Sequence, residues 1–268
     1  RVVVPHGNLR ALSVYDSRSG KLVRQFEGRR FTQLHVCDSG LLAVFHDGKL
    51  EMYDPAKLDK PVWTRTYDQN RYPAVLADGR ELLAVSPANN SDTLELIEVL
   101  TGKKRSEVKL SKPGQGVAHL VDATFVGEEL LVTCCPQNPG RRKYYFGSMS
   151  RARSGMSLHQ VVMTGKTARL GWVHPFETNK RFHAWGVPVT VGRSHLAVTI
   201  RPNQLQFQPR VVLLRRDDGE VVQTIDLIAG KEPDPRTLQR RVQMLGPAVM
   251  TNGQLCVETT KGVQVYGR

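Results

Sequence analysis

The chain has 268 residues and a hydrophobic content of 40%, which allows one large domain with a substantial core and excludes wholesale disorder. No apolar run approaches the ~18 to 20 residues that a membrane-spanning helix needs. The net charge is +13, from 38 Lys and Arg against 25 Asp and Glu. This balance favours anionic partners such as nucleic acid, an anionic membrane surface or a polyanionic polymer. Because the arginine pairs are scattered along the sequence, we expect a diffuse positive field rather than one patch.

The N-terminus and the cysteines say less about function than the charge does. The chain begins at Arg1 without a signal peptide, so we expect a processed product or a piece of a longer protein. Cys37, Cys134, Cys135 and Cys256 form no C-x-x-C pair, so the sequence indicates no zinc site of the usual spacing and no other metal site. Each cysteine lies in or beside an expected strand, where a buried thiol behaves as a small apolar residue.

Short apolar runs of strand length, separated by Gly, Asn and Asp turns, recur along the whole chain and predict an all-β fold. One unit repeats: a strand that ends in an acidic or polar residue, a tight turn with Gly before Lys or Glu, and a second strand. Gly supplies the positive φ that a tight hairpin requires, and the polar residue before it satisfies local backbone donors. In chain order the turns are centred on Gly20, Asp59, Gly102, Gly165 and Gly219, and a last strand at 262–266 begins a sixth copy.

The spacing of these turns predicts the architecture. The gaps are roughly 39, 43, 63 and 54 residues, and a repeat of ~40 to 50 residues with about four strands is typical of a β-propeller. We therefore expect one β-propeller domain over residues 1–268, with about six four-stranded antiparallel blades, incomplete at both ends or part of a seven- to eight-bladed ring. The expected units are a partial blade 1–28, blades 29–68, 69–110, 111–173 and 174–228, and a partial blade 229–268. Within a blade the strands are A to D, and the repeat turn joins C to D.

The turn residues carry a family resemblance. Val14-Tyr15-Asp16 with Ser19-Gly20-Lys21, and Tyr53-Asp54 with Val62-Trp63, resemble the PQQ-like propeller repeat, in which an aspartate, a Thr-Gly-Lys turn and a tryptophan follow one another. Trp63 falls at the tryptophan position, which holds Arg24, Ser106, Arg169 or Gln223 in the other copies. The resemblance covers most of the chain at the level of the repeat. It implies a structural role for Asp16, Gly20, Asp54, Trp63, Gly102, Gly165 and Gly219.

The same resemblance raises the question of a cofactor. Quinoprotein alcohol dehydrogenases share this propeller type and place a disulfide between adjacent cysteines against their quinone, and Cys134-Cys135 matches that dipeptide. The calcium-binding and catalytic acidic residues of those enzymes have no counterpart that we can place on this chain. We therefore expect the non-quinone-binding branch and no cofactor. Cys134 and Cys135 are interpreted as a strand-end pair, one thiol pointing in and one out.

The lengths of the connections predict where function lies. The A–B and C–D turns emerge on one face of a blade, and the B–C and D–A connections emerge on the other. Every long segment is a B–C or a D–A connection. These segments are 87–92, 136–156 and 201–209 between B and C, and 111–116, 174–186 and 229–241 between D and A. Long irregular loops are uncommon unless they are functional or disordered, so we expect any binding function on this face.

Two of these connections carry the candidate binding residues. Cations interleaved with aromatic side chains suit phosphate contacts and stacking, as in single-strand nucleic-acid or glycan sites. The residues are Arg141, Arg142, Lys143, Tyr144 and Tyr145, joined on the same face by Arg181, His183 and Trp185. The alternative for the aromatic residues is structural, as a strand of the insertion or as anchors of a loop.

No motif indicates catalysis: paired histidines, G-x-S-x-G, a P-loop and G-x-G-x-x-G are all missing from the sequence. His35, His119 and His159 lie within expected strands, where a structural histidine is the default. We predict a non-catalytic binding or assembly module for a protein partner or anionic ligand; the resemblance implies part of a larger bacterial protein of the periplasm or cell envelope. Two alternatives stay open: an enzyme or binding protein for an anionic polymer or glycan in the central pocket, and non-specific nucleic-acid binding through the basic surface.

Overall fold

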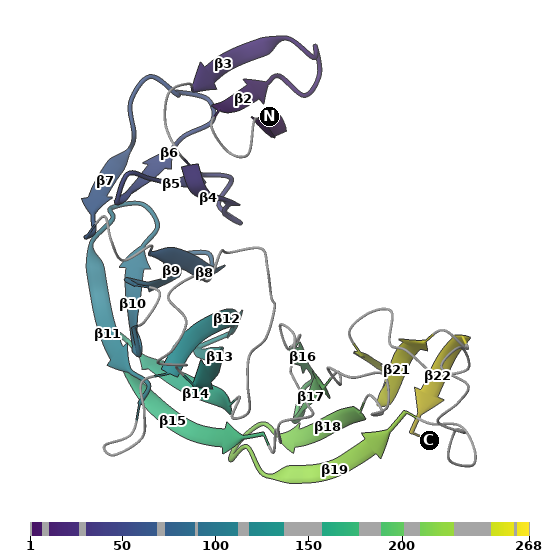
Figure 1. Cartoon of the computed structure of the whole chain (residues 1–268). Coiled ribbons are helices and arrows are strands. Elements are labelled where there is room, and N and C mark those ends of the chain that lie inside the picture. The colour runs from purple at the N-terminus through teal and green to yellow at the C-terminus, as the bar shows by residue number, and fades with distance from the viewer. Residues whose placement is uncertain are drawn as a thin grey trace, which may run out of the picture. The chain divides into compact units, whose positions relative to one another are not determined.

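A computed structural model of the chain describes residues 2–6, 11–26, 31–68, 73–88, 91–111, 118–136, 157–176, 189–200, 210–227, 248–259 and 262–267. These residues form β-strands joined by turns (Figure 1). No helix occurs among them, and so none that could cross a membrane. The predicted all-β class is confirmed.

The strands form six sheets in which neighbours in sequence are also neighbours in space. The middle four sheets have four strands each, and the first and last have three. The first three sheets are β1 (Val2–His6), β2 (Ala11–Tyr15), β3 (Leu22–Phe26); β4 (Phe31–Val36), β5 (Leu42–His46), β6 (Lys49–Tyr53), β7 (Trp63–Thr66); and β8 (Ala74–Asp78), β9 (Leu82–Ser86), β10 (Thr93–Glu98), β11 (Lys104–Lys109). The other three are β12 (Ala118–Val126), β13 (Glu129–Pro136), β14 (Ser157–Thr164), β15 (Thr167–Pro175); β16 (Val189–Val191), β17 (His195–Ile200), β18 (Arg210–Arg215), β19 (Val221–Asp226); and β20 (Val249–Thr251), β21 (Gln254–Thr259), β22 (Gly262–Tyr266).

The chain divides into two compact units, residues 1–128 with 162–169, and residues 129–161 with 170–268. The predicted extent of a single domain over 1–268, with its blade boundaries and ring closure, stays a prediction. The predicted four-stranded antiparallel blades are confirmed as sheets.

Apolar layers lie between successive sheets. Phe45 and Met52 of the β4–β7 sheet pack with Leu83 and Ile97 of the β8–β11 sheet in one buried cluster. In the second unit, the β16–β19 and β20–β22 sheets share a comparable cluster. Because the second strand of a sheet is covered on both faces, it is buried throughout and mostly apolar rather than alternating: all five residues of β5 and all five of β9 are buried, with only His46 and Ser86 polar.

The C–D turn has the same backbone geometry in three sheets. In each, the glycine N–H donates to the carbonyl oxygen four residues earlier at 2.9 Å, and a register shift precedes the turn. The pairs are Gly20 with Asp16, Gly102 with Glu98, and Gly219 with Arg215. The three glycines have φ values of 67°, 68° and 72°, a left-handed conformation that residues with a Cβ rarely adopt. The repeat found in the sequence is therefore a repeat of one turn geometry.

Two tryptophans join neighbouring sheets at this turn. The Nε1 of Trp63 donates to the carbonyl oxygen of Val99 at 2.8 Å, and its ring lies so close to Gly102 that an added Cβ would stand 2.6 Å from it. Trp172 of β15 does the same two interfaces later, in the second unit: its Nε1 donates to the carbonyl oxygen of Arg216 at 2.9 Å and its ring covers Gly219. In both cases the accepting carbonyl lies three residues before the glycine.

Trp172 corrects the sequence alignment of the fourth copy. The sequence placed Arg169 at the tryptophan position, but Trp172, three residues later, makes the contact. The shift follows from the length of the hairpin. The strands β14 and β15 have 8 and 9 residues, whereas β6 and β7 have 5 and 4, so the turn at Gly165 lies further from the residue that contacts the next sheet.

Where the tryptophan is missing, a polar contact reaches the next sheet instead. Arg24 pairs with the exposed carboxylate of Asp59 at 3.2 Å, and the Ser106 hydroxyl accepts the N–H of Ala168 at 3.1 Å. Exposed ion pairs contribute little, and a neutral hydrogen bond contributes about 1 kcal/mol. The two tryptophan contacts are therefore the strongest of these sheet-to-sheet links.

Substitution of two glycines tests the contact between Trp63 and Gly102. Gly20 and Gly102 occupy equivalent C–D turns of different sheets and have nearly the same φ, but nothing lies within 4 Å of a Cβ added at Gly20. Gly20→Ala is expected to cost about 1 kcal/mol of unfolding free energy through backbone strain alone. Gly102→Ala is expected to cost about 1 to 3 kcal/mol more, because the Trp63 ring must move. Urea unfolding measures both; equal losses would contradict the tryptophan contact.

Candidate functional site

The strand order assigns each connection to one end of its sheet. In a sheet whose antiparallel strands follow sequence order, the A–B and C–D turns lie at one end, here called the turn end. The B–C and D–A segments lie at the other, here called the connection end. With the observed strand bounds, the long segments 137–156 and 201–209 are B–C connections, and 177–188 and 228–247 belong to D–A connections.

The binding residues expected from the sequence lie in two of these segments. Arg141, Arg142, Lys143, Tyr144 and Tyr145 fall between β13 and β14, and Arg181, His183 and Trp185 fall between β15 and β16. All eight are outside the described residues. Their assignment to a ligand stays a prediction.

Charge is divided between the strands and the connections. The described residues contain 18 Lys and Arg against 21 Asp and Glu. The internal segments outside them, each a B–C or D–A connection, contain 18 Lys and Arg against 4 Asp and Glu. Residues 137–156 alone hold five Lys and Arg and no acidic residue. Three of the four arginine pairs, at 29–30, 141–142 and 240–241, fall in connections, and the expected diffuse field stays a prediction.

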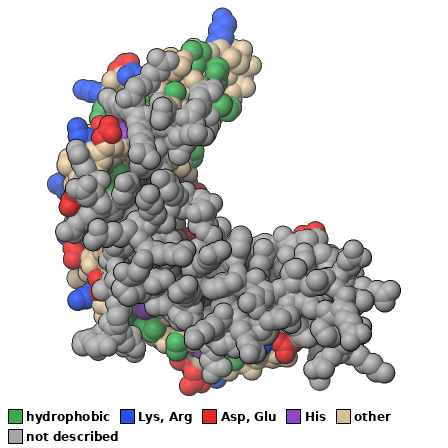
Figure 2. All heavy atoms as spheres, viewed as in Figure 1, with side chains coloured by type: hydrophobic (Ala, Val, Ile, Leu, Met, Phe, Trp, Pro, Cys, Tyr) green, Lys and Arg blue, Asp and Glu red, His purple; other side chains and the backbone are tan. Residues whose placement is uncertain are grey.

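Several of the described cations form ion pairs with neighbouring acids. On the face shown in Figure 2, blue and red side chains alternate over the coloured residues. Arg65 contacts Glu95 at 3.2 Å, and Arg216 contacts Glu129 at 3.1 Å. These pairs stabilise contacts within and between sheets, so they are not available to attract a distant anion.

Two buried glutamates sit at equivalent positions of neighbouring C strands. Glu51 of β6 accepts hydrogen bonds from Tyr53 at 2.6 Å and lies 2.7 Å from Nε2 of His46. Glu95 of β10 accepts from Arg65 and from the Tyr67 hydroxyl, both at 3.2 Å. Burial and the Glu95 carboxylate raise the pKa of Tyr67 above its usual range. Each acid is thus held inside the fold by several polar partners, which is a structural arrangement.

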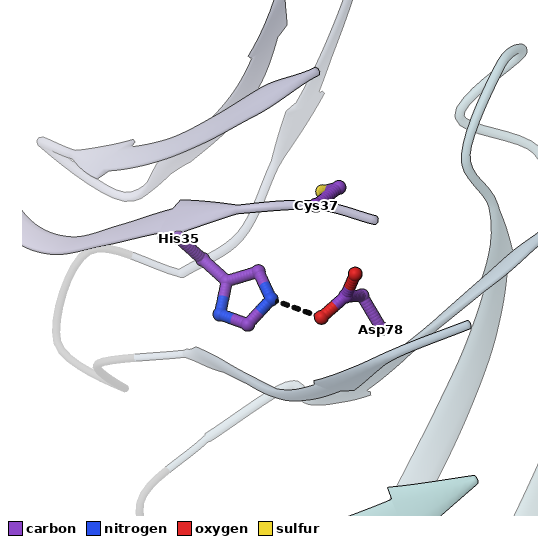
Figure 3. Close-up of side chains that lie close together, drawn as sticks. All are labelled: His35, Cys37 and Asp78. Carbon is purple, nitrogen blue, oxygen red and sulfur yellow. Dashed lines mark hydrogen bonds and ion pairs between the residues drawn. The ribbon is translucent and has the colours of Figure 1, made fainter. Parts of the chain in front are cut away.

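A third polar group lies at the turn end of the first unit. His35 is on β4, Cys37 follows β4 directly, and Asp78 ends β8 of the next sheet, so two sheets contribute (Figure 3). The Nε2 of His35 lies 2.5 Å from one carboxylate oxygen of Asp78, and the N–H of Asp38 donates to the other at 2.5 Å. One nitrogen, the sulfur and one carboxylate oxygen lie within 4.8 Å of one another.

In the absence of a metal ion, the Cys37 thiol stays protonated in this setting. Burial, together with the nearby Asp78 and Asp38 carboxylates, raises the pKa of the thiol to about 12. The sequence treated His35 as a structural histidine and Cys37 as an apolar thiol, and it did not connect either to Asp78, which is 43 residues from His35. The available signal was a His-x-Cys pair at the end of one A strand and an aspartate at the end of the next.

A hollow of about 870 Å³ lies between the β16–β19 and β20–β22 sheets of the second unit. Its lining includes His195, Gln223, Met250, Asn252 and Tyr266, mostly from turn-end segments. Gln223 stands at the tryptophan position of the fifth copy, so this position supplies no indole ring to cover the next sheet as Trp63 and Trp172 do.

Comparison with known proteins identifies the fold. No family model and no curated protein matches the chain. Dihydro-heme d1 dehydrogenase NirN, solved in complex with DHE, superposes with a TM-score of 0.58 at 12% identity over 96% of this chain, which spans 50% of NirN. A Kluyveromyces lactis Hsv2 with loop 6CD replaced by a Gly-Ser linker gives 0.52 at 10% identity, covering 96% of this chain and 78% of Hsv2. BamB from Moraxella catarrhalis gives 0.47 at 13% identity, covering 100% of this chain and 84% of BamB.

The fold is that of a β-propeller. The sheets provide the antiparallel blades, and at two interfaces a tryptophan covers the repeated turn of the next sheet. At such low identities the likeness extends to the fold and to nothing else.

The state of Cys37 can be checked by alkylation. With a pKa of about 12, only about one thiol in ten thousand is ionised at pH 8, and thiolate is the reactive form. In native protein kept in chelator, Cys37 is expected to react with iodoacetamide far more slowly than the less buried Cys256. Peptide mass mapping over time measures both rates, and urea should equalise them. Rapid native labelling of Cys37 would contradict the assigned environment.

Proposed function

We propose that this propeller is a non-catalytic binding or assembly module that takes an anionic ligand, or the acidic surface of a protein partner, at the connection ends of its blades. The observation that carries the proposal is the division of charge: the connections hold almost all of the excess positive charge, whereas the described residues are slightly acidic. A positive surface of this kind raises the local concentration of anions and their rate of association.

The arrangement of the fold supports the same proposal. The sheets are fixed to one another at their turn ends by Trp63 and Trp172, so the connection ends are free of that constraint. The connection at 137–156 combines Arg141, Arg142 and Lys143 with Tyr144 and Tyr145. Guanidinium and ammonium groups would contact sulfate, phosphate or carboxylate, and the rings would stack on sugars or bases.

The proposal extends to location and to the alternatives. On the resemblance of the repeat, we place the module outside the bacterial cytoplasm, in the periplasm or cell envelope. An enzyme acting on an anionic polymer would need acids or histidines gathered at the connection ends. The described sets around Glu51, Glu95 and Asp78 instead serve contacts within and between sheets, which favours binding over catalysis.

Two charge-reversed triple variants test the proposal with heparin as the probe. Arg141→Glu, Arg142→Glu and Lys143→Glu change a connection, while Arg18→Glu, Lys21→Glu and Lys60→Glu make the same change in net charge at exposed turn-end positions. We expect the connection variant to bind heparin at least about tenfold more weakly and with a shallower salt dependence, because fewer counterions are released. The turn-end variant should bind like the parent chain.

Titration in increasing salt, followed by fluorescence anisotropy, measures both affinity and slope. Equal weakening in the two variants would show that net charge alone acts, which overturns the proposed face. Equal affinity for DNA duplexes of unrelated sequence and for heparin would favour non-specific nucleic-acid binding instead.

A further inference from the structure

We propose that His35, Cys37 and Asp78 form a three-ligand site for Zn²⁺ that joins the β4–β7 sheet to the β8–β11 sheet. The three side chains offer an imidazole nitrogen, a sulfur and a carboxylate oxygen, and these ligand atoms already lie within 4.8 Å of one another. The site is distinct from the connection ends, where the proposed function lies, because all three residues are at the turn end of their sheets.

The dimensions suit a tetrahedral ion. Zinc binds nitrogen and oxygen at about 2.0 to 2.2 Å and sulfur at about 2.3 Å, which places the ligand atoms about 3.4 to 3.6 Å apart. The Nε2 of His35 and the Oδ1 of Asp78 are now 2.5 Å apart, joined by a hydrogen bond (Figure 3). Replacing the shared proton by the ion requires these two atoms to separate by about 1 Å, a shift within reach of side-chain rotation.

The donor set selects the kind of metal. As the ion binds, the Cys37 thiol loses its proton to solvent and the sulfur binds the metal as a thiolate. A thiolate is a soft ligand and imidazole a borderline one, and together they favour Zn²⁺ over Mg²⁺ and Ca²⁺, which prefer all-oxygen sites. Three protein ligands leave a fourth tetrahedral position for water or for a donor from a bound partner.

The surroundings hold the ligands in place and leave a path for the ion. Two residues before His35, the amide of Gln33 donates to the carbonyl oxygen of Val75 at 2.7 Å and accepts its N–H at 2.8 Å, so β4 and β8 are fixed side by side. The N–H of Asp38 orients the second oxygen of Asp78. The side chains of His35 and Asp78 are 27% and 13% exposed, so the ion can reach them from solvent, while Cys37 closes the inner side.

Cobalt is the most direct probe of this site. The full chain, purified in a non-thiol reductant and stripped of metal, is titrated with Co²⁺, whose bond to a thiolate produces charge-transfer absorption in the near ultraviolet. We expect one such site per chain, displaced by one equivalent of Zn²⁺ and unaffected by millimolar Mg²⁺. Cys37→Ser should abolish the absorption, and Cys256→Ser, which changes the less buried thiol of the β20–β22 sheet, should retain it.

Cys37 is buried in the apolar layer between the two sheets, so Cys37→Ser could also disturb the fold. A second variant therefore separates loss of metal binding from misfolding. Asp78→Asn keeps the size of the side chain, so the metal-free fold, followed by circular dichroism, should be unchanged. Its affinity for Zn²⁺ should fall at least about tenfold. Zinc should raise the midpoint of thermal unfolding of the parent chain but not of Asp78→Asn, because only a ligand bound to the folded state stabilises it.

Three outcomes would overturn the site. These are no thiolate absorption in the parent chain, absorption that survives Cys37→Ser, and unchanged zinc affinity in Asp78→Asn. The second would place the metal on another thiol, such as Cys134 or Cys135. None of the three outcomes depends on heparin binding, so the experiments test the metal site and the proposed function independently.

Discussion

The contact of an indole ring with a left-handed glycine of the next sheet is the constraint on which this fold depends. A blade cannot bury its faces alone, so its stability comes from the neighbour on each side. Trp63 and Trp172, both half-buried, supply an apolar ring and a directed hydrogen bond at the same point, and a Cβ on the glycines beneath them would clash with the rings. At Gly102 and Gly219 the turn therefore requires glycine both for its backbone conformation and for the ring packed on it.

Fixing the sheets at their turn ends has a consequence for the opposite ends. The B–C and D–A segments do not take part in these contacts, so their length and composition can vary without loss of the scaffold. In this chain they are long and strongly basic, and the sheets that carry them are slightly acidic. This division of charge between connections and strands is the basis of the proposal that the chain takes an anionic partner at its connection ends.

The local features of the fold could be predicted from the sequence, because they depend on short-range chemistry. Gly20, Gly102 and Gly219 identify the turns by their conformational freedom, and the apolar runs identify the strands. The position of Trp172 could not be predicted, since a hairpin longer than its counterparts shifts the contact by three residues without changing the turn motif.

Contacts between sheets are the other part that sequence reasoning missed. His35, Cys37 and Asp78 belong to different repeats and meet only because β4 and β8 lie side by side. The same holds for Glu95 with Arg65. The division of charge was visible only once the strands had been separated from the connections, because counting along the sequence mixes the two.

Hydrogen–deuterium exchange of the full chain with and without heparin tests the central claim most directly, because it reports ligand contact along the whole backbone. The account predicts slower exchange in residues 137–156 and 177–188 on binding. It predicts no change in the C–D turns at residues 16–21, 98–103 and 215–220. Protection confined to those turns, or spread evenly over the chain, would contradict a binding surface at the connection ends.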